Sequence, residues 1–299
     1  MPPVEHRRRG IALRVGGVSC FAAMMAALKY GTVHGVDPVE VLFYRNLFSL
    51  PTIVAWVVLG GGWATVRTQR PAAHATRSAL GLSVMFCTFL SLSMLPLAEA
   101  TLISFSAPFF ATALSALLLR EKVLWHRWTG IAVGITGVIV VVRPGEAALP
   151  LAGIVVGLTA ALGAGLVTIT LRQIGRTETA TATVFWFNLA CLLATAIPMP
   201  FVFRIHSPDA WVALVIGGLM GGIAQIMTTA AVRYAPVSAL APFDYLQIVW
   251  AMLWSLFLFG TYPAASAIAG AVLIGAGGVY VLWRERHMHK AVVASASEV

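Results

Sequence analysis

"VEVLFYRNLFSLPTIVAWVVL", residues 39–59, is an apolar stretch with a charged side chain in its interior, Arg45. At 1.5 Å per residue, about 20 such residues cross a hydrocarbon core of roughly 30 Å. A guanidinium inside that core costs at least a few kcal/mol, so an intramembrane arginine normally has a partner or a function. The stretch therefore predicts a membrane-spanning helix and raises the question of what Arg45 contacts.

Similar stretches recur along the whole chain, which has 299 residues, 59% of them hydrophobic and 10% charged. Soluble domains carry about 25% charged residues. We place spans near residues 11–30, 39–59, 75–95, 99–119, 127–142, 151–171, 179–203, 210–232, 237–258 and 264–283. A transmembrane barrel would instead show alternating segments of about ten residues. The pattern predicts an all-α polytopic membrane protein with ten transmembrane helices.

The basic residues indicate the orientation of these spans. The net charge is +9, but the Lys and Arg residues lie between spans and not on one face of a soluble domain, which excludes nucleic acid as a partner. With the N-terminus inside, Lys29, Arg143 and Arg204 fall on the outer side, while most of the others fall on the inner side. The positive-inside rule then predicts a multi-pass protein of the inner (cytoplasmic) membrane with both termini in the cytoplasm.

The chain also matches itself at a shift of 140 residues, where Gly81 meets Gly221. A slip of two residues after the first span brings Asn46 onto Asn188. Five spans per repeat is an odd number, so the second repeat crosses the membrane in the opposite sense. Inverted repeats that rock about a midplane site are typical of secondary transporters.

The repeat predicts the domain organisation. We expect a first five-helix repeat over residues 1–145, a second over residues 146–284, and a cytoplasmic tail over residues 285–299 whose polar end, "ASASEV" (294–299), is disordered.

Two segments carry a family resemblance: "LPLAEATLISFSAPFFATALSALLLREKVLWHRWTGIAVGITGVIVVVRPG" (95–145) and "APVSALAPFDYLQIVWAMLWSLFLFGTYPAASAIAGAVLIGAGGVYVLWRE" (235–285). Both resemble the EamA repeat of the drug/metabolite transporter superfamily, although Thr261 stands where the first copy has Glu121. The chain is most similar to the YddG-type amino-acid exporters. The resemblance implies a ten-helix basket, with spans 1–4 and 6–9 around a central cavity.

The resemblance further implies a secondary transporter that exports aromatic or neutral amino acids, or related small metabolites, by alternating access. The alternatives are uptake or exchange of another metabolite (nucleoside-like or sulfonium) and drug efflux. A membrane enzyme or a scaffold is the alternative from a different class. An enzyme is disfavoured because the histidines lie in loops or at span edges, so we expect no catalytic residue, metal or cofactor. The expected partners are a small-molecule substrate and the lipid bilayer, with monomer and homodimer both open.

Polar groups within spans face one another, water or a substrate, because lipid offers them no hydrogen bonds. With neighbouring aromatic residues, they make up the candidate cavity: Tyr44, Arg45, Asn46, Phe86, Ser104, Phe105, Trp186, Asn188, Gln225, Thr228, Asp244, Tyr245 and Gln247.

Repeat equivalence sharpens the interpretation of four of these residues. For Asn46 and Asn188 we favour a hydrogen bond between helices over substrate contact. Phe105 and Tyr245 are predicted to form facing walls on spans 4 and 9.

Two prolines are candidate kinks or hinges. Pro51 and Pro108 lie inside spans 2 and 4, where a proline removes a backbone hydrogen bond.

The two deep charges have separate predicted roles. Arg45 lies about 9 Å from the outer end of its span, so we expect it to extend outward toward Glu40 or Glu99 and to attract a substrate carboxylate. Asp244 lies near the inner end of span 9, which argues against a direct bridge to Arg45. We expect an isolated Asp244 that binds a substrate ammonium, with a structural bond or a coupling proton as alternative roles.

Overall fold

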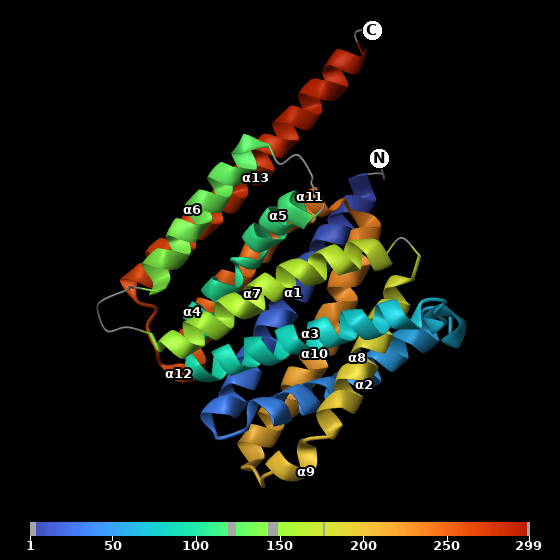
Figure 1. The fold of residues 1–299 in the computed structure, drawn as a ribbon, viewed down its shortest axis with the longest axis vertical. Coiled ribbons are helices and arrows are strands. Elements are labelled where there is room, and N and C mark those ends of the chain that lie inside the picture. Colours follow the sequence, from blue (N-terminus) through green and yellow to red (C-terminus); the bar gives the residue numbers. More distant parts are fainter. Residues whose placement is uncertain (1–3, 119–123, 143–148, 176, 298–299) are drawn as a thin grey trace.

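A computed structural model describes residues 4–118, 124–142, 149–175 and 177–297, and these residues are helical apart from short connections. The positions of Glu121 and Arg143 lie outside the described residues. The elements shown in Figure 1 are α1 (Val4–Val33), α2 (Pro38–Leu59), η1 (Trp63–Val66), α3 (Pro71–Met94), α4 (Leu97–Ser104), α5 (Ala107–Leu118), α6 (Trp125–Val142), α7 (Leu151–Ile174), α8 (Ala180–Ala196), α9 (Met199–Val202), α10 (Pro208–Tyr234), α11 (Val237–Leu240), η2 (Ala241–Tyr245), α12 (Leu246–Phe259) and α13 (Ala265–Ser297).

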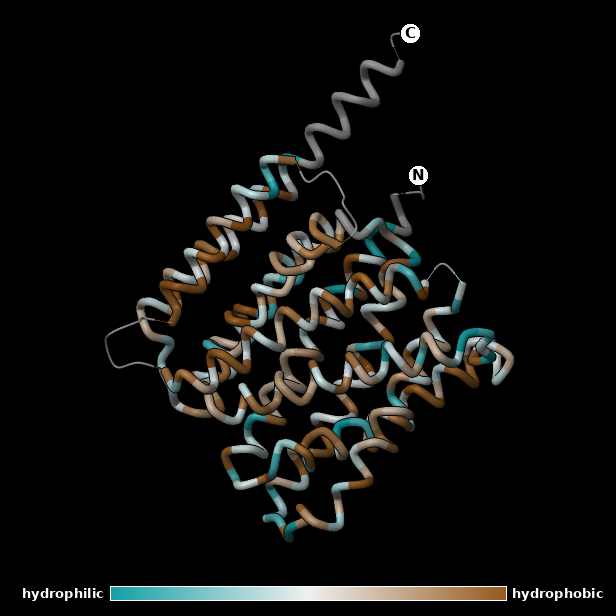
Figure 2. The backbone as a smooth tube through the Cα atoms, in the orientation of Figure 1, coloured by the Kyte–Doolittle hydropathy of each residue, from teal (hydrophilic) through white to brown (hydrophobic). Residues whose placement is uncertain are grey.

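The helices account for the ten predicted spans. Eight helical segments are long and apolar enough to cross a membrane, and the segments Ala180–Ala196 and Ala265–Val281 are shorter apolar helices. Hydrophobic residues occur along the whole length of the helices in Figure 2. Large side chains such as Leu117 and Phe257 are 75% and 76% exposed. An exposed apolar surface of this kind suits lipid contact, and the chain is an all-helical membrane protein.

Several boundaries differ from the sequence prediction. Span 4 is divided into α4 and α5 at Phe105–Ser106, just before Pro108, whereas α2 continues through Pro51. Span 7 ends in a separate short helix, α9, and α13 runs to Ser297. The predicted tail is thus helical over residues 285–297, which include the first part of the segment 294–299 that was expected to be disordered.

The pairing of helices follows a pseudo-two-fold axis between the two halves. Helix α1 (span 1) packs against α10 (span 8). Helix α7 (span 6) packs in the same way against α3 (span 3), and these are the repeat equivalents of α1 and α10. The pairs α2–α8 and α4–α12 are their own equivalents, and so is the pair α6–α13, which runs side by side at the edge of the molecule (Figure 1). Both termini lie at one end of the molecule, as an even number of crossings requires (Figure 1).

Two contacts between equivalent residues mark this axis. The Nδ2 of Asn188 donates to Oδ1 of Asn46 at 3.2 Å. The rings of Phe105 and Tyr245 stack with centroids 5.5 Å apart and planes inclined by 28°. The breaks in spans 4 and 9 thus meet each other, and paired broken helices are characteristic of inverted-repeat transporters.

Candidate functional site

A cavity of about 270 Å³ lies between the two halves, and one end of it is formed by two arginines, Arg45 and Arg77. The complete lining is Phe21, Arg45, Arg77, Gly81, Val84, Met85, Ala164, Val167, Phe187, Gly221, Ala224, Gln225 and Thr228. A second space of about 630 Å³ shares Arg77, Gln225 and Thr228 with the first.

The second space leads away from the centre, along the C-terminal parts of α7 and α10, to Gly175 and Val232. These helix ends lie beside the N-terminal part of α1, because a Cβ atom at Gly17 would stand 2.7 Å from Cγ2 of Thr228. The central cavity therefore opens toward the end of the molecule that carries both termini.

Arg45 is buried in this cavity, with 6% of its surface exposed. Its Nη1 donates to Oδ1 of Asn46 at 2.9 Å, its Nη2 donates to Oε1 of Gln225 at 3.4 Å, and its Nε has no partner. The expected outward extension toward Glu40 or Glu99 is not seen. The guanidinium of Arg45 instead packs against Gly221 of α10, because this glycine has no side chain there: a Cβ atom at Gly221 would lie 3.4 Å from Nε of Arg45.

Arg77 is the second buried guanidinium, 8% exposed, and it comes from α3. It lies over the ring of Phe187, with Cζ 4.1 Å from the ring centroid. Its Nε and Nη1 are buried and without a hydrogen-bond partner. A Cβ atom at Gly81 would meet this Nη1 and would stand 2.6 Å from Cε2 of Phe187.

The sequence interpretation missed Arg77 because it was counted among the inner basic residues at the edge of span 3. A usable signal was present in its spacing. Arg77 and Gly81 are four residues apart, so they share a helix face. Gly81 is also the repeat equivalent of Gly221, the glycine that makes room for Arg45.

The carboxylates near the cavity already have partners. Asp244 accepts two hydrogen bonds from Arg14, from Nε to Oδ1 and from Nη2 to Oδ2, both 2.6 Å long. The expected isolated Asp244 is thus a bidentate ion pair. It was mispredicted because Arg14 was assigned to the inner surface, whereas it lies on α1 within reach of η2.

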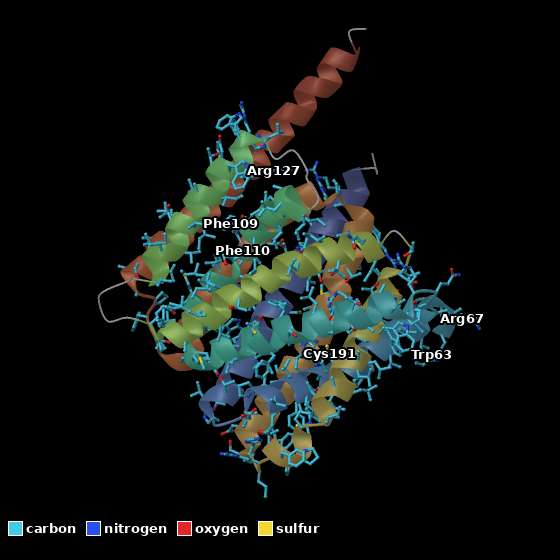
Figure 3. All side chains as sticks on the ribbon, viewed as in Figure 1. Trp63, Arg67, Phe109, Phe110, Arg127 and Cys191 are labelled. Atoms are coloured by element: carbon cyan, nitrogen blue, oxygen red, sulfur yellow. The ribbon has the colours of Figure 1, made fainter. Side chains whose placement is uncertain are left out.

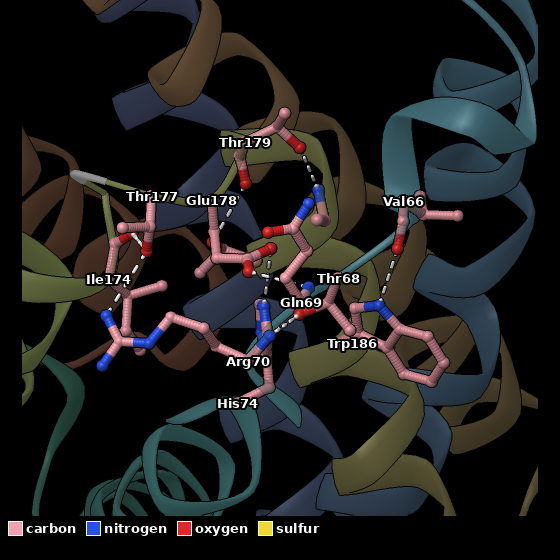
Figure 4. Close-up of polar contacts among 12 residues, drawn as sticks. Val66, Thr68, Gln69, Arg70, His74, Ile174, Thr177, Glu178, Thr179 and Trp186 are labelled. Carbon is pink, nitrogen blue, oxygen red and sulfur yellow. Dashed lines mark hydrogen bonds and ion pairs between the residues drawn. The ribbon is translucent and has the colours of Figure 1, made fainter. Parts of the chain in front are cut away.

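Glu178 lines the wide end of the cavity and belongs to a contact between two connections, residues 60–70 and 177–179 (Figure 4). Its carboxylate accepts from the backbone N–H of Gln69 at 3.2 Å and lies 3.4 Å from Nε2 of His74. Thr179 donates to the carbonyl of Thr65 at 2.8 Å in the same contact. We call these interactions the loop contact.

The loop contact sets the ionisation of Glu178. Burial alone would raise the pKa of this carboxyl group, but the hydrogen bonds from His74, from the N–H of Gln69 and from Thr68 outweigh burial and lower the pKa below 4.5. Glu178 is therefore a carboxylate at neutral pH that is already satisfied by its neighbours.

The opposite end of the molecule is closed. Glu40 is fully buried and lies 3.0 Å from Nε2 of His206, and it accepts the backbone N–H of Arg204 at 3.1 Å. Lys29 donates to the carbonyl of Leu92 at 2.7 Å. These contacts tie α2 to the connection before α10 and the end of α1 to the end of α3, so they hold this end of the two halves together.

Of the remaining candidate residues, some line the cavity and others do not. Gln225 and Thr228 line the cavity, as expected. Asn188 lies beside it and donates to Oγ of Ser49 at 2.6 Å, while its Oδ1 is buried without a partner. Tyr44 packs away from the cavity against Trp211, with ring centroids 4.8 Å apart.

Trp186 and Phe86 also lie outside the described cavity. Nε1 of Trp186 donates to the carbonyl of Val66 at 2.8 Å (Figure 4), and its neighbour Phe187 faces the cavity instead. Successive residues of a helix point about 100° apart, which explains why Phe187 faces the cavity while the adjacent Trp186 does not. Phe86 is 37% exposed, as expected of a side chain at the lipid surface.

The last two candidates lie on the broken spans. The hydroxyl of Ser104 donates to the carbonyl of Thr101 within its own helix at 2.6 Å. Gln247 is half-buried on α12 and does not line the described cavities.

The chemistry of this arrangement follows from its unpaired donors. An arginine remains protonated in proteins and presents a planar set of N–H groups that match a carboxylate or phosphate. In the part of the chain that the structure describes, Arg45 and Arg77 have no carboxylate partner. The cavity is therefore equipped to bind an anionic group.

Comparison with known proteins gives the following matches. The sequence profile of the EamA-like transporter family matches residues 8–143 and 151–283. A solved crystal structure superimposes with a TM-score of 0.68 over 92% of this chain and 97% of that chain, at 18% identity, which shows a shared fold.

Three relatives illustrate the range of similar proteins. An uncharacterized transporter of Helicobacter pylori strain J99 is 27% identical over 284 residues, 91% of this chain and 94% of the relative. An S-adenosylmethionine uptake transporter of Rickettsia prowazekii is 26% identical over 248 residues, 83% of each chain. The pseudopaline exporter CntI of Pseudomonas aeruginosa is 24% identical over 271 residues, 89% of this chain and 93% of the relative.

These relatives are named for different cargoes and for opposite directions of transport. They support the EamA part of the expected resemblance, and they do not narrow it to YddG-type amino-acid exporters. Because the matched family is one of transporters, the enzyme alternative is excluded.

Proposed function

The chain belongs to the EamA-like transporter family, and on that premise we propose that it exports a small, carboxylate-bearing metabolite by alternating access. The aromatic and neutral amino acids expected from the sequence fall within this class, since each carries a carboxylate.

The observation that carries the proposal is the pair of buried guanidiniums at the central cavity. Arg45 and Arg77 keep unpaired N–H groups there, and burial of an unpaired charge is costly enough that membrane proteins retain it for function. A carboxylate of the cargo supplies the missing acceptors. Charge-assisted hydrogen bonds of this kind contribute about 1.5–3 kcal/mol each.

The closed and open ends support alternating access. The cavity opens at the end that holds both termini, while the contact between Glu40 and His206 closes the other end. In inverted-repeat transporters the halves rock about a fixed central site. The opposite state would open the Glu40 end and seal the wide cavity.

The proposed direction depends on which end faces the cytoplasm. The positive-inside rule places the termini, and with them the open cavity, in the cytoplasm, so cargo loads there and leaves outward. A His34→Cys variant tests the orientation. We expect a membrane-impermeant thiol reagent to label it in intact cells; labelling only after lysis would reverse the orientation. The intrinsic cysteines, Cys20, Cys87 and Cys191, are replaced by Ala in the background.

Transport itself is tested with purified protein in liposomes loaded with radiolabelled carboxylates, amino acids among them. We expect efflux above protein-free liposomes for at least one carboxylate, and loss of most of that efflux in Arg45→Gln and Arg77→Gln. The exposed Arg67, at the α2–α3 connection (Figure 3), provides a matched control in Arg67→Gln. Equal flux with and without protein for the whole panel would overturn the proposal.

A further inference from the structure

The net charge of the described cavity is positive. Arg45 and Arg77 line its centre without a carboxylate partner. Arg14 lines the wide part, where Asp244 already neutralises it. The acidic residue on the described lining is Glu178, and the loop contact occupies it. Two positive charges therefore remain uncompensated.

This net positive charge disfavours a zwitterion, such as a neutral amino acid, as the cargo. The carboxylate of a neutral amino acid would meet the guanidiniums, but its ammonium group would then need an acceptor in the same small space. The neutral groups on the lining already take part in hydrogen bonds: Oε1 of Gln225 accepts from Arg45, and the hydroxyl of Thr228 donates to the carbonyl of Ala224. Beside the cavity, Oδ1 of Asn188 has no partner, but a neutral amide oxygen carries no charge that would balance an ammonium group. An ammonium beside two guanidiniums would add like-charge repulsion to a desolvated site.

A second negative charge on the cargo removes both problems. Each guanidinium then faces one anionic group, and the filled site has no net charge, which is the least costly condition for a buried charged cluster. Apart from the two arginines, Gln225 and Thr228, the lining is apolar or small, with Phe21, Val84 and Met85 available to the carbon chain. The volume of about 270 Å³ at the arginines limits that chain to a short one.

Building on the proposed function, we propose that the cargo is a small organic dianion, a short-chain dicarboxylate, bound with its two carboxylates on Arg45 and Arg77. The ligand class thus follows from the charges of the site and not from the overall fold.

The first test is a ligand panel on the purified full-length protein. The probes are succinate, its monoamide succinamate, phenylalanine and inorganic phosphate, and the readouts are ligand-induced thermal shift and isothermal titration calorimetry. We expect succinate to bind about tenfold or more tightly than succinamate, because the amide removes one charge and nothing else. Phenylalanine should bind more weakly still.

Variants then assign the effect to the two arginines. In Arg45→Gln and Arg77→Gln, succinate affinity should fall about tenfold or more and approach that of succinamate. Arg67→Gln, which removes a charge outside the cavity, should keep the wild-type preference. Should a glutamine variant fail to fold, Arg45→Lys and Arg77→Lys take its place; they keep the charge, and weaker but still dianion-selective binding is expected.

Three results would overturn the inference: equal affinity for succinate and succinamate, tighter binding of phenylalanine, or binding of inorganic phosphate with no response to succinate. Unchanged succinate binding in both glutamine variants would do the same. These failures are distinguishable from failure of the proposed function. If the liposomes export phenylalanine but no dicarboxylate, the dianion inference falls and transport stands; if they export neither, the proposed function falls.

Discussion

Replacing Arg77 by methionine should make the ligand-free protein more stable while it weakens anion binding. The guanidinium of Arg77 buries two nitrogen atoms without partners, and each unsatisfied buried group costs about 1–3 kcal/mol. Against this, the contact of Cζ with the Phe187 ring at 4.1 Å returns about 0.5–2 kcal/mol. Methionine keeps an apolar chain in the same space.

Two such nitrogen atoms cost about 2–6 kcal/mol, so the difference is a gain of about 0–5.5 kcal/mol, centred near about 3 kcal/mol, in the free energy of unfolding for Arg77→Met. At about 2 °C per kcal/mol for a chain of this size, the central value corresponds to a rise of about 6 °C in the midpoint of thermal unfolding. If Arg77 had a purely structural role, its replacement would instead lower the thermal midpoint, because removing one partner of a satisfied contact lowers stability.

The assay is thermal unfolding in detergent, with and without a saturating dicarboxylate. Wild type should gain stability from the ligand, and Arg77→Met should gain little. Arg67→Met is the matched control, and a surface change of this kind should shift stability by no more than about 0.5 kcal/mol. A midpoint for ligand-free Arg77→Met below that of wild type would refute the reasoning, because Arg77 would then be a satisfied structural group.

Three further predictions concern other contacts. Gly81→Ala should fold but bind the anion about tenfold more weakly, measured by calorimetry, because the new Cβ displaces the guanidinium of Arg77; unchanged affinity would contradict the role of this glycine. Leucine substitutions of Phe105 and Tyr245, singly and together, should give a coupling energy of about 0.5–1.5 kcal/mol in a thermal-stability double-mutant cycle, and strictly additive effects would show that the stacked rings do not interact. Because the contacts of Glu178 lower its pKa from the ordinary value in the folded state, its contribution is fully present above the ordinary pKa and is lost as the pH falls through the lowered pKa. Wild type should therefore be more stable than Glu178→Gln at about pH 6, and the difference should shrink as the pH is lowered, whereas a constant difference would reject the ionised contact.

Repeat symmetry was the part of the structure that the sequence predicted best. Asn46 and Asn188 were expected to form hydrogen bonds between helices, and they form one with each other. Phe105 and Tyr245 were expected to face each other as walls of the cavity; they do face each other, but their rings stack and line neither described cavity. The ten spans were likewise predictable from hydropathy, since each must be about 20 residues long.

Side-chain direction was harder to predict than helix position. The sequence interpretation placed Arg45 inside a helix but gave it the wrong partner, because the space that receives its side chain is made by a glycine of another helix, Gly221. Arg77 and Arg14 were both read as surface charges at helix ends. Both helices begin before their apolar stretches, so a charged residue near the start of the stretch is not at the end of the helix and can pack against other helices. Hydropathy alone does not predict where the helix begins.

The two halves of the molecule are related by symmetry and yet are not interchangeable. By the register that pairs Asn46 with Asn188, the counterpart of Arg45 is Phe187, so one repeat places a cation where the other places a ring. The loop contact joins residues 60–70 to residues 177–179, segments that are not copies of each other. In the proposed alternating access, swapping the conformations of the two repeats would convert an inward-facing form into an outward-facing one, and with identical repeats the two forms would have equal free energy. Because the repeats differ, the proposed mechanism gives the two empty forms different free energies, so the empty protein would favour one side of the membrane.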